Sequence, residues 1–165
     1  MQKNLLSLIF ISALVLTSTA HAKVTYDLTG SSGTRDGESF SEIHLGLNWY
    51  LSDWLNWRNS VFTQFGTKIK EVYGLDSEAL FSWEAYTSAR DLGIELFAGP
   101  GVRMASEKSN AAFGKAGVTF AVAGLRLGGG VQALHYLEER QDKDGRTLPK
   151  DEVQTFITLS GGGSF

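Results

Sequence analysis

The residues that could support nucleophilic catalysis are few and poorly placed for it. An activated serine or cysteine needs a general base, usually histidine, within reach. The chain contains no cysteine, and His44 and His135 lie in segments where apolar and polar residues alternate. Two residues after each histidine stand Gly46 and Leu137, so neither has a serine at that spacing. Asp76-Ser77 places an acid beside a hydroxyl but has no neighbouring histidine, and we therefore expect no catalytic residue.

Metal and cofactor sites are not expected either. Asp142, Asp144 and Gly145 resemble the start of a calcium-binding loop, in which acidic ligands follow a set spacing. The later acidic ligands of such a loop are missing, so we interpret this segment as a solvated loop. The glycine triplets at 128–130 and 161–163 are not followed by a helical pattern, so they do not predict a phosphate site.

The first 22 residues have the organisation of a secretory signal peptide. Lys3 supplies a positive charge, residues 5–16 form an uncharged apolar run, and Ala20 and Ala22 make an A-x-A cleavage pattern. The apolar run is too short to span a bilayer as a helix. We expect cleavage after Ala22, export to the periplasm, and one mature domain comprising residues 23–165.

The charge of the mature chain gives no reason to expect polyanionic partners. Without Lys3 it carries 14 basic against 18 acidic residues, a net charge of −4. This balance argues against binding to nucleic acid or to an anionic membrane surface. No later stretch approaches twenty apolar residues, so only a closed barrel could take the mature chain across a membrane.

The mature chain is a succession of segments in which apolar and polar residues alternate. In the clearest segment, residues 42–51, Leu45 and Leu47 share one face while Glu42 and His44 share the other. Eight such segments follow one another, the last of them at residues 153–165. A period of two is typical of strands, and no segment shows a helical period over a useful length.

The connections between the segments alternate in length. Long polar gaps occupy residues 31–39, 67–77, 105–111 and 138–151. Tight gaps occupy residues 52–53, 88–91 and 121–124. Short turns at one end and long loops at the other are typical of outer-membrane barrels. The sequence therefore predicts an all-β fold: a single antiparallel up-and-down transmembrane β-barrel of about eight strands, with short periplasmic turns and four longer extracellular loops.

On these features, the whole mature length resembles the small eight-stranded outer-membrane barrels of the OmpA/OmpX type. Phe165 is similar to the C-terminal aromatic residue that bacterial barrel proteins present to their assembly machinery. The resemblance implies insertion into the outer membrane and a structural or surface-interaction role, without a cofactor. The partners it implies are outer-membrane lipid and lipopolysaccharide, the barrel assembly machinery, and an extracellular ligand bound through the loops.

Two other functions remain open. Lipid A deacylases and palmitoyltransferases use barrels of similar size, and acyl chemistry would centre on Asp76 and Ser77 in the second long gap. A soluble, lipocalin-like periplasmic barrel that binds an apolar ligand would show the same alternation. Aromatic residues near the second turn favour the membrane, because amphipathic rings gather at membrane interfaces. These are Trp49, Tyr50, Trp54 and Trp57.

With lipid outside, the charged residues must point inward, because a lipid-facing Arg or Lys at the bilayer midplane costs about 2–4 kcal/mol. Eight strands enclose only enough room for side chains, so buried charges there must pair. We expect an ion-paired, side-chain-filled lumen and not an open porin. It would be formed by Glu42, His44, Arg58, Glu84, Glu95, Arg103, Lys115 and Arg126. A narrow pore gated by one exchanging Arg–Glu pair is an alternative that the sequence leaves open.

Overall fold

The structure is a computed structural model that describes residues 23–35, 37–66, 69–88, 92–122 and 125–161. These residues form the strands β1 (Lys23–Arg35), β2 (Glu38–Ser52), β3 (Leu55–Gly66), β4 (Val72–Thr87), β5 (Leu92–Ala105), β6 (Ala111–Val122), β7 (Leu125–Tyr136) and β8 (Asp151–Gly161). Within this part of the chain, no helix is long and apolar enough to cross a membrane. The expected signal peptide, residues 1–22, and Phe165 lie outside the described residues.

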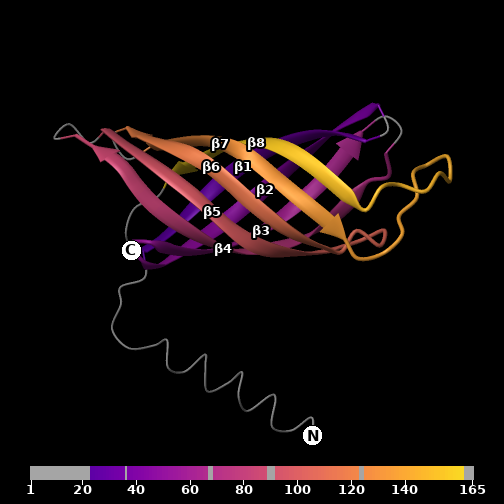
Figure 1. Ribbon diagram of the computed structural model, residues 1–165, viewed down its shortest axis with the longest axis horizontal. Helices are drawn as coiled ribbons and strands as arrows, with labels where there is room; N and C mark the ends of the chain where they lie inside the picture. Colours follow the sequence, from indigo (N-terminus) through magenta and orange to yellow (C-terminus); the bar gives the residue numbers. More distant parts are fainter. Residues whose placement is uncertain (1–22, 36, 67–68, 89–91, 123–124, 162–165) are drawn as a thin grey trace, which may run out of the picture.

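The strands form a closed antiparallel barrel in which each strand pairs with its neighbours in sequence and β1 pairs with β8 (Figure 1). The closing ladder runs from Tyr26 opposite Gly161 to Gly33 opposite Gln154. Closure matters because an open sheet would leave a row of unpaired backbone groups at each edge. The predicted all-β, up-and-down barrel of eight strands is confirmed.

Side chains alternate between the two faces of the barrel wall, polar inward and apolar outward. Along β2, Glu42 is 1% exposed and His44 is 3% exposed, whereas Leu45 is 60% exposed. A soluble barrel that carries an apolar ligand needs the opposite arrangement, an apolar lumen inside a polar wall. This polarity is the reverse of what the lipocalin-like alternative requires, because the lumen is charged and the apolar face is outside.

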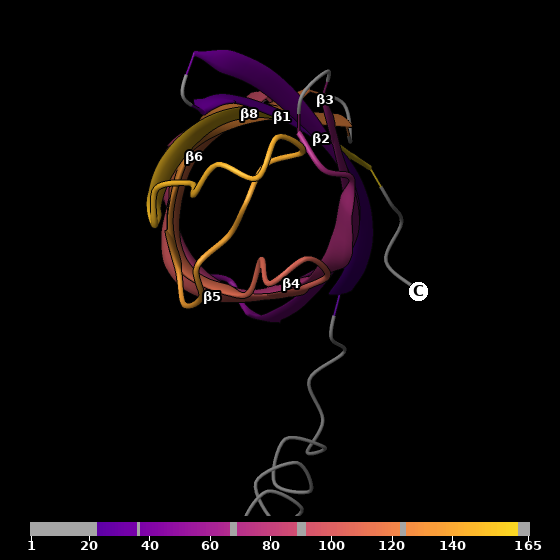
Figure 2. The same cartoon turned by 90° about the vertical axis from the view of Figure 1, so that its right-hand side faces the viewer.

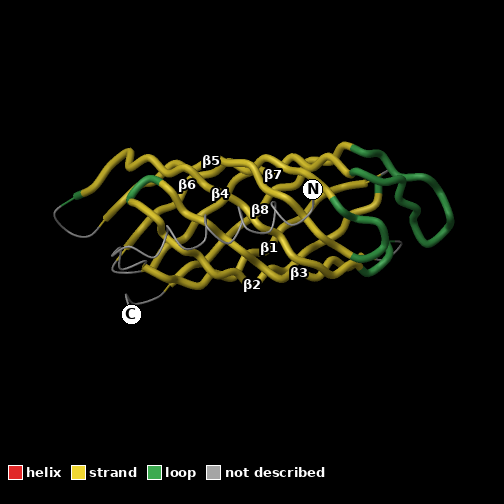
Figure 3. Tube along the Cα trace, turned by 90° about the horizontal axis from the view of Figure 1, so that it is seen from below, coloured by secondary structure: helices red, strands yellow, loops and turns green. Residues whose placement is uncertain are grey.

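Four of the seven connections between the strands are shorter than predicted. At one end of the barrel, the turn end, the strands are joined by residues 53–54, 88–91 and 123–124. At the other end, the loop end, they are joined by residues 36–37, 67–71, 106–110 and 137–150, so three of the four expected loops are longer than any turn and the first is reduced to two residues (Figure 3). Much of the polar sequence predicted as loop belongs to strands, because its alternate side chains face the polar lumen.

Aromatic rings fill the lumen where the wall carries glycine. The rings of Phe97 and Phe156 lie with their centroids 6.1 Å apart. A Cβ atom at Gly117 would lie 2.7 Å from the Phe97 ring and against the backbone carbonyl of Gly129. Only glycine leaves the space that this ring occupies. Side chains therefore pack the lumen at this level, as an eight-stranded wall requires.

Candidate functional site

The first group of buried charges, the Arg58 cluster, lies in the half of the lumen nearer the turn end. Arg58 donates from Nε and Nη2 to the two carboxylate oxygens of Asp27 at 2.8 and 2.6 Å, and from Nη1 to Glu78. Lys115 Nζ donates to Glu78 Oε1 at 3.1 Å. All four side chains belong to residues that are at most 7% exposed. Two cations and two anions therefore compensate one another, as the burial of charge requires.

Neutral side chains complete the coordination of the Arg58 cluster. Asn48 Nδ2 donates to Asp27 Oδ2 at 2.8 Å, and Thr29 Oγ1 donates to Asp27 Oδ1 at 2.9 Å. Lys115 Nζ also lies 4.7 Å from the centroid of the Phe156 ring. Every oxygen of Asp27 thus has more than one donor, which holds the carboxylate in one orientation.

The second group, the Arg103 cluster, lies nearer the loop end. Arg103 donates to both oxygens of Glu42 at 3.0 Å each and to both oxygens of Asp76 at 2.8 Å each. Its guanidinium carbon lies 4.0 Å from the centroid of the Phe62 ring. His44 Nε2 is 3.1 Å from Glu42 Oε2, and His44 Nδ1 is 3.6 Å from Asp76 Oδ2. Two carboxylates therefore share one guanidinium and one imidazole.

A third group, the cap cluster, closes the loop end. Arg35 Nε donates to Glu152 Oε2 at 2.7 Å, and Arg140 Nη2 lies 3.6 Å from the same oxygen. The Arg140 guanidinium stacks 3.1 Å from the centroid of Tyr136 and donates to the carbonyl of Pro149 at 2.8 Å. Burial lowers the pKa of Arg140 from its ordinary value. These contacts hold the long connection between β7 and β8 across the opening of the barrel (Figure 2).

Gln154 joins the Arg103 cluster to the cap cluster. Its Nε2 donates to Glu42 Oε1 at 3.1 Å and to Glu152 Oε1 at 2.9 Å. The residue is 1% exposed, so both bonds lie in the interior, where hydrogen bonds are electrostatically stronger than in water. The loop-end half of the lumen is thus one connected network of polar side chains.

The clusters leave little free volume in the lumen. A cavity beside the Arg58 cluster, lined in part by Asn48, Asn56 and Arg126, has a volume of about 50 Å³. This is room for a few water molecules and for no larger ligand. The arrangement can therefore link the strands across the lumen and obstruct ions, and the cavity beside the Arg58 cluster offers no space for a substrate.

The structure brings some of the predicted lumen residues together and separates others. Five lie in the Arg58 and Arg103 clusters, namely Glu42, His44, Arg58, Arg103 and Lys115. Glu95 and Arg126 form a separate, partly exposed ion pair of 3.3 Å at the turn end. Glu84 is exposed and forms no ion pair with another described residue. It lies opposite Glu95 beside a bulge in β4, outside the buried network, and the prediction needs correction there.

The prediction missed several carboxylates of the clusters, and two of them show why. Asp76 lies within the polar stretch 67–77 that reads as a loop, and Glu78 directly follows it, yet both are 2% exposed in β4. Ser77 faces the opposite side of the wall, where its hydroxyl accepts a hydrogen bond from Trp57 Nε1 at 3.1 Å. Asp76 and Ser77 therefore lie in a strand on opposite faces, which removes the loop site that acyl chemistry would require.

Three of the four predicted interface aromatics lie on the outer wall near the turn end. Trp54 and Trp57 are 57% and 47% exposed, and the rings of Trp49 and Trp57 lie 5.6 Å apart. Tyr50 faces the lumen instead, where its hydroxyl accepts a hydrogen bond from Arg126 at 3.1 Å. The alternation along β2 explains this difference, because adjacent residues point to opposite faces of a strand.

Comparison with known proteins identifies the fold but no family. No family model and no curated protein matches the sequence. The crystal structure of Neisserial surface protein A (NspA) is similar, with a TM-score of 0.57 and 11% identity over 88% of this chain and 98% of that one. The crystal structure of the outer membrane enzyme PagL is also similar, with a TM-score of 0.53 and 17% identity over 83% of this chain and 99% of that one. At these identities the similarity shows a shared eight-stranded barrel fold and nothing finer.

Proposed function

We propose that this chain is an integral outer-membrane β-barrel with a closed, ion-paired lumen and a structural or surface-interaction role. The observation that carries the proposal is the polarity of the wall. Leu45 and Ile157 are 60% and 67% exposed on the outside, while Arg58 and Arg103 are 4% and 2% exposed inside. A continuous apolar outer face is unfavourable in water and is the surface that lipid covers. The likeness to a surface protein and to an outer membrane enzyme supports the same location.

The paired side chains in the lumen favour a barrel that is closed to ions. To pass the Arg103 cluster, an ion would have to displace a guanidinium from two carboxylates and shed its own water. Removing a charge from water without compensation is very costly. The cap cluster adds a second obstruction at the loop end, where Arg35 is bound to Glu152.

The partners follow from this placement. Outer-membrane lipid and lipopolysaccharide would contact the apolar wall, and the barrel assembly machinery would insert the chain. The long connection, residues 137–150, is the longest of the connections between the eight strands and is where an extracellular ligand would bind. Nucleic acid is not among the proposed partners, because the mature chain has a net charge of −4, from 14 basic and 18 acidic residues.

Acyl chemistry on lipid A is the alternative, and one observation favours it. His135 Nδ1 lies 2.7 Å from Asp151 Oδ1 in an exposed pair at the loop end, an orientation that suits a general base. The similarity to PagL, an outer membrane enzyme, points the same way. Leu137 stands where a serine would complete a His-x-Ser pair, so the nucleophile is not supplied at that position. Mass spectra of lipid A from cells with and without the protein test this alternative, and a changed acyl pattern would establish it.

Two measurements test the proposed function. Cell fractionation with a heat-modifiability gel should place a compact barrel in the outer membrane. Purified monomers in a planar bilayer should show no large, steady conductance, because paired side chains fill the lumen. Recovery of the protein in the soluble periplasm would overturn the membrane proposal, and steady porin-like openings would overturn the closed lumen. Brief, rare flickers would identify instead a gate made by one exchanging Arg–Glu pair.

A further inference from the structure

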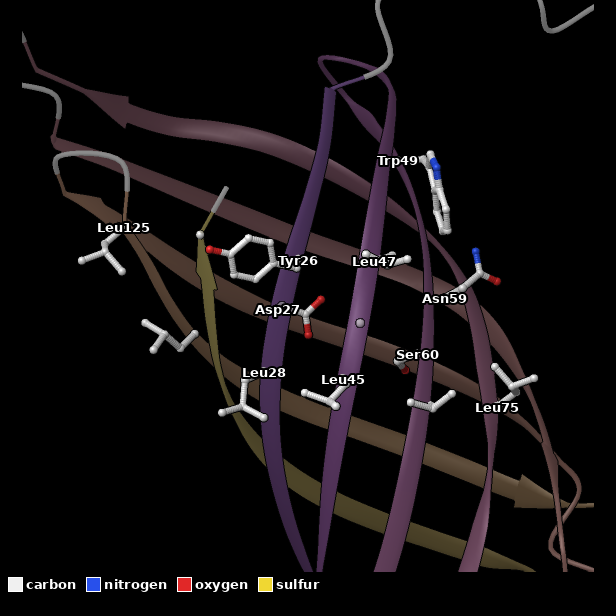
Figure 4. A pocket seen from close by; sticks show the side chains of 14 residues that line it. Tyr26, Asp27, Leu28, Leu45, Leu47, Trp49, Asn59, Ser60, Leu75 and Leu125 are labelled. Atoms are coloured by element: carbon white, nitrogen blue, oxygen red, sulfur yellow. The ribbon is translucent and has the colours of Figure 1, made fainter. Parts of the chain in front are cut away.

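The outer wall carries an apolar groove over β1, β2 and β3 that extends from the turn end toward the middle of the barrel (Figure 4). Its volume is about 690 Å³, and its lining includes Leu28, Leu45, Val61 and Leu75. Ligand sites usually have volumes of roughly 300–1,000 Å³ and mostly apolar walls with a few polar groups. The groove has these properties, although it lies outside the barrel and not in the lumen.

Asn59 is a polar exception in this part of the wall. It projects from β3 on the outward face, where its neighbours across the ladders are Leu47 of β2 and Ser77 of β4. Ser77 is already bonded to Trp57, and the Asn59 amide forms no hydrogen bond with another described residue. An amide without a partner is costly in hydrocarbon. A membrane-embedded Asn59 therefore needs a partner other than the described residues, and lipid is the molecule that this outer face would contact.

The position of Asn59 indicates what that partner is. Tyr26 and Trp49 line the groove on its turn-end side, and Asn59 lies beside Trp49 (Figure 4). Aromatic residues of this kind mark the level of the lipid headgroups. A polar amide at this level, next to a leucine-lined groove, is complementary to an amphiphile whose polar linkage and acyl chain lie side by side.

We propose that the groove binds one glycerophospholipid of the inner leaflet, with an acyl chain on the leucine floor and an ester carbonyl accepting a hydrogen bond from Asn59. The proposal rests on the proposed function, because only a barrel in a membrane presents this wall to lipid. Short turns face the periplasm in outer-membrane barrels, which selects the inner leaflet. The convex wall of a second barrel fits a groove poorly, whereas a flexible chain can fill it.

Native mass spectrometry of the detergent-purified full chain, with added palmitoyl-oleoyl-phosphatidylethanolamine, tests this site. Val61→Trp fills the groove, and Val131→Trp is the matched control, because the two valines are 54% and 50% exposed on the outer wall. We expect one tightly retained phospholipid on the unmodified chain and on the control. Retention should weaken about tenfold in Val61→Trp, the change that corresponds to about 1.4 kcal/mol.

Asn59→Leu tests the polar contact separately from the apolar floor. It should also weaken phospholipid retention about tenfold, a loss of about 1.4 kcal/mol, while Asn59→Gln keeps an amide and should retain more lipid. Equal retention by every variant would overturn the proposal. Dimers that disappear in Val61→Trp would also overturn it and identify the groove as a contact between two copies. The unmodified chain and each variant are first checked for heat-modifiable migration and outer-membrane recovery. Failure of the unmodified chain in that check would refute the proposed function, whereas equal lipid retention by chains that pass it would refute the groove alone.

Discussion

Replacement of Arg103 by methionine tests whether the buried charges stabilise the barrel. Methionine keeps part of the apolar stem but removes the guanidinium, so Glu42 and Asp76 each lose two hydrogen bonds. Both carboxylates are at most 2% exposed, and His44 remains beside them. A buried charge deprived of its partner costs about 3–5 kcal/mol. We expect the free energy of unfolding to fall by that amount.

Urea unfolding in phospholipid vesicles, followed by tryptophan fluorescence and heat-modifiability, measures this loss. Arg126→Met is the matched control, because the Arg126–Glu95 pair is partly exposed and its loss should cost at most about 1 kcal/mol. Glu42→Gln with Asp76→Asn, added to Arg103→Met, removes the unpaired charges and should restore most of the stability. A loss of less than about 1 kcal/mol in Arg103→Met, the value of an exposed pair, would refute the reasoning. So would a triple variant no more stable than the single one.

Three further changes test the wall, the packing of the lumen and assembly. Leu45→Arg places a charge on the lipid face near the middle of β2 and should lower the free energy of unfolding in vesicles by about 2–4 kcal/mol. Val122→Arg, on the outer face at the turn end of β6, should cost at most about 1 kcal/mol; equal effects would mean that the wall does not face lipid. Gly117→Ala pushes a Cβ atom into an aromatic ring of the lumen and should cost about 1–3 kcal/mol. Gly114→Ala is its control on the same strand, because nothing lies within 4 Å of the added Cβ, and matching losses in urea unfolding would contradict the packing argument. Deletion of Phe165 should slow assembly and leave protein in the periplasm, as pulse-chase fractionation can measure, and normal surface levels would refute its role as an assembly signal.

The fold was predictable because its main signal is local. Successive residues of a strand point to opposite faces, so the alternation of His44, Leu45 and Leu47 with their neighbours assigns each side chain to a face without knowledge of the fold. The same local rule predicts inward positions for Arg58, Arg103 and Lys115, which the structure buries. Loop lengths were less predictable, since a polar strand facing a polar lumen has the composition of a loop.

Partners across the lumen depend on closure and register, which no local pattern encodes. Glu42 in β2 and Arg103 in β5 are 61 residues apart in sequence and meet only because the sheet closes into a barrel. The bulge in β4 is another feature that the local pattern does not encode. Glu84 follows the alternation and yet lies exposed outside the buried network. The sequence by itself determined the barrel and the face of most side chains, through a period of two. Only the tertiary structure decided which charges pair, because the stagger between strands sets the height at which each side chain enters the lumen.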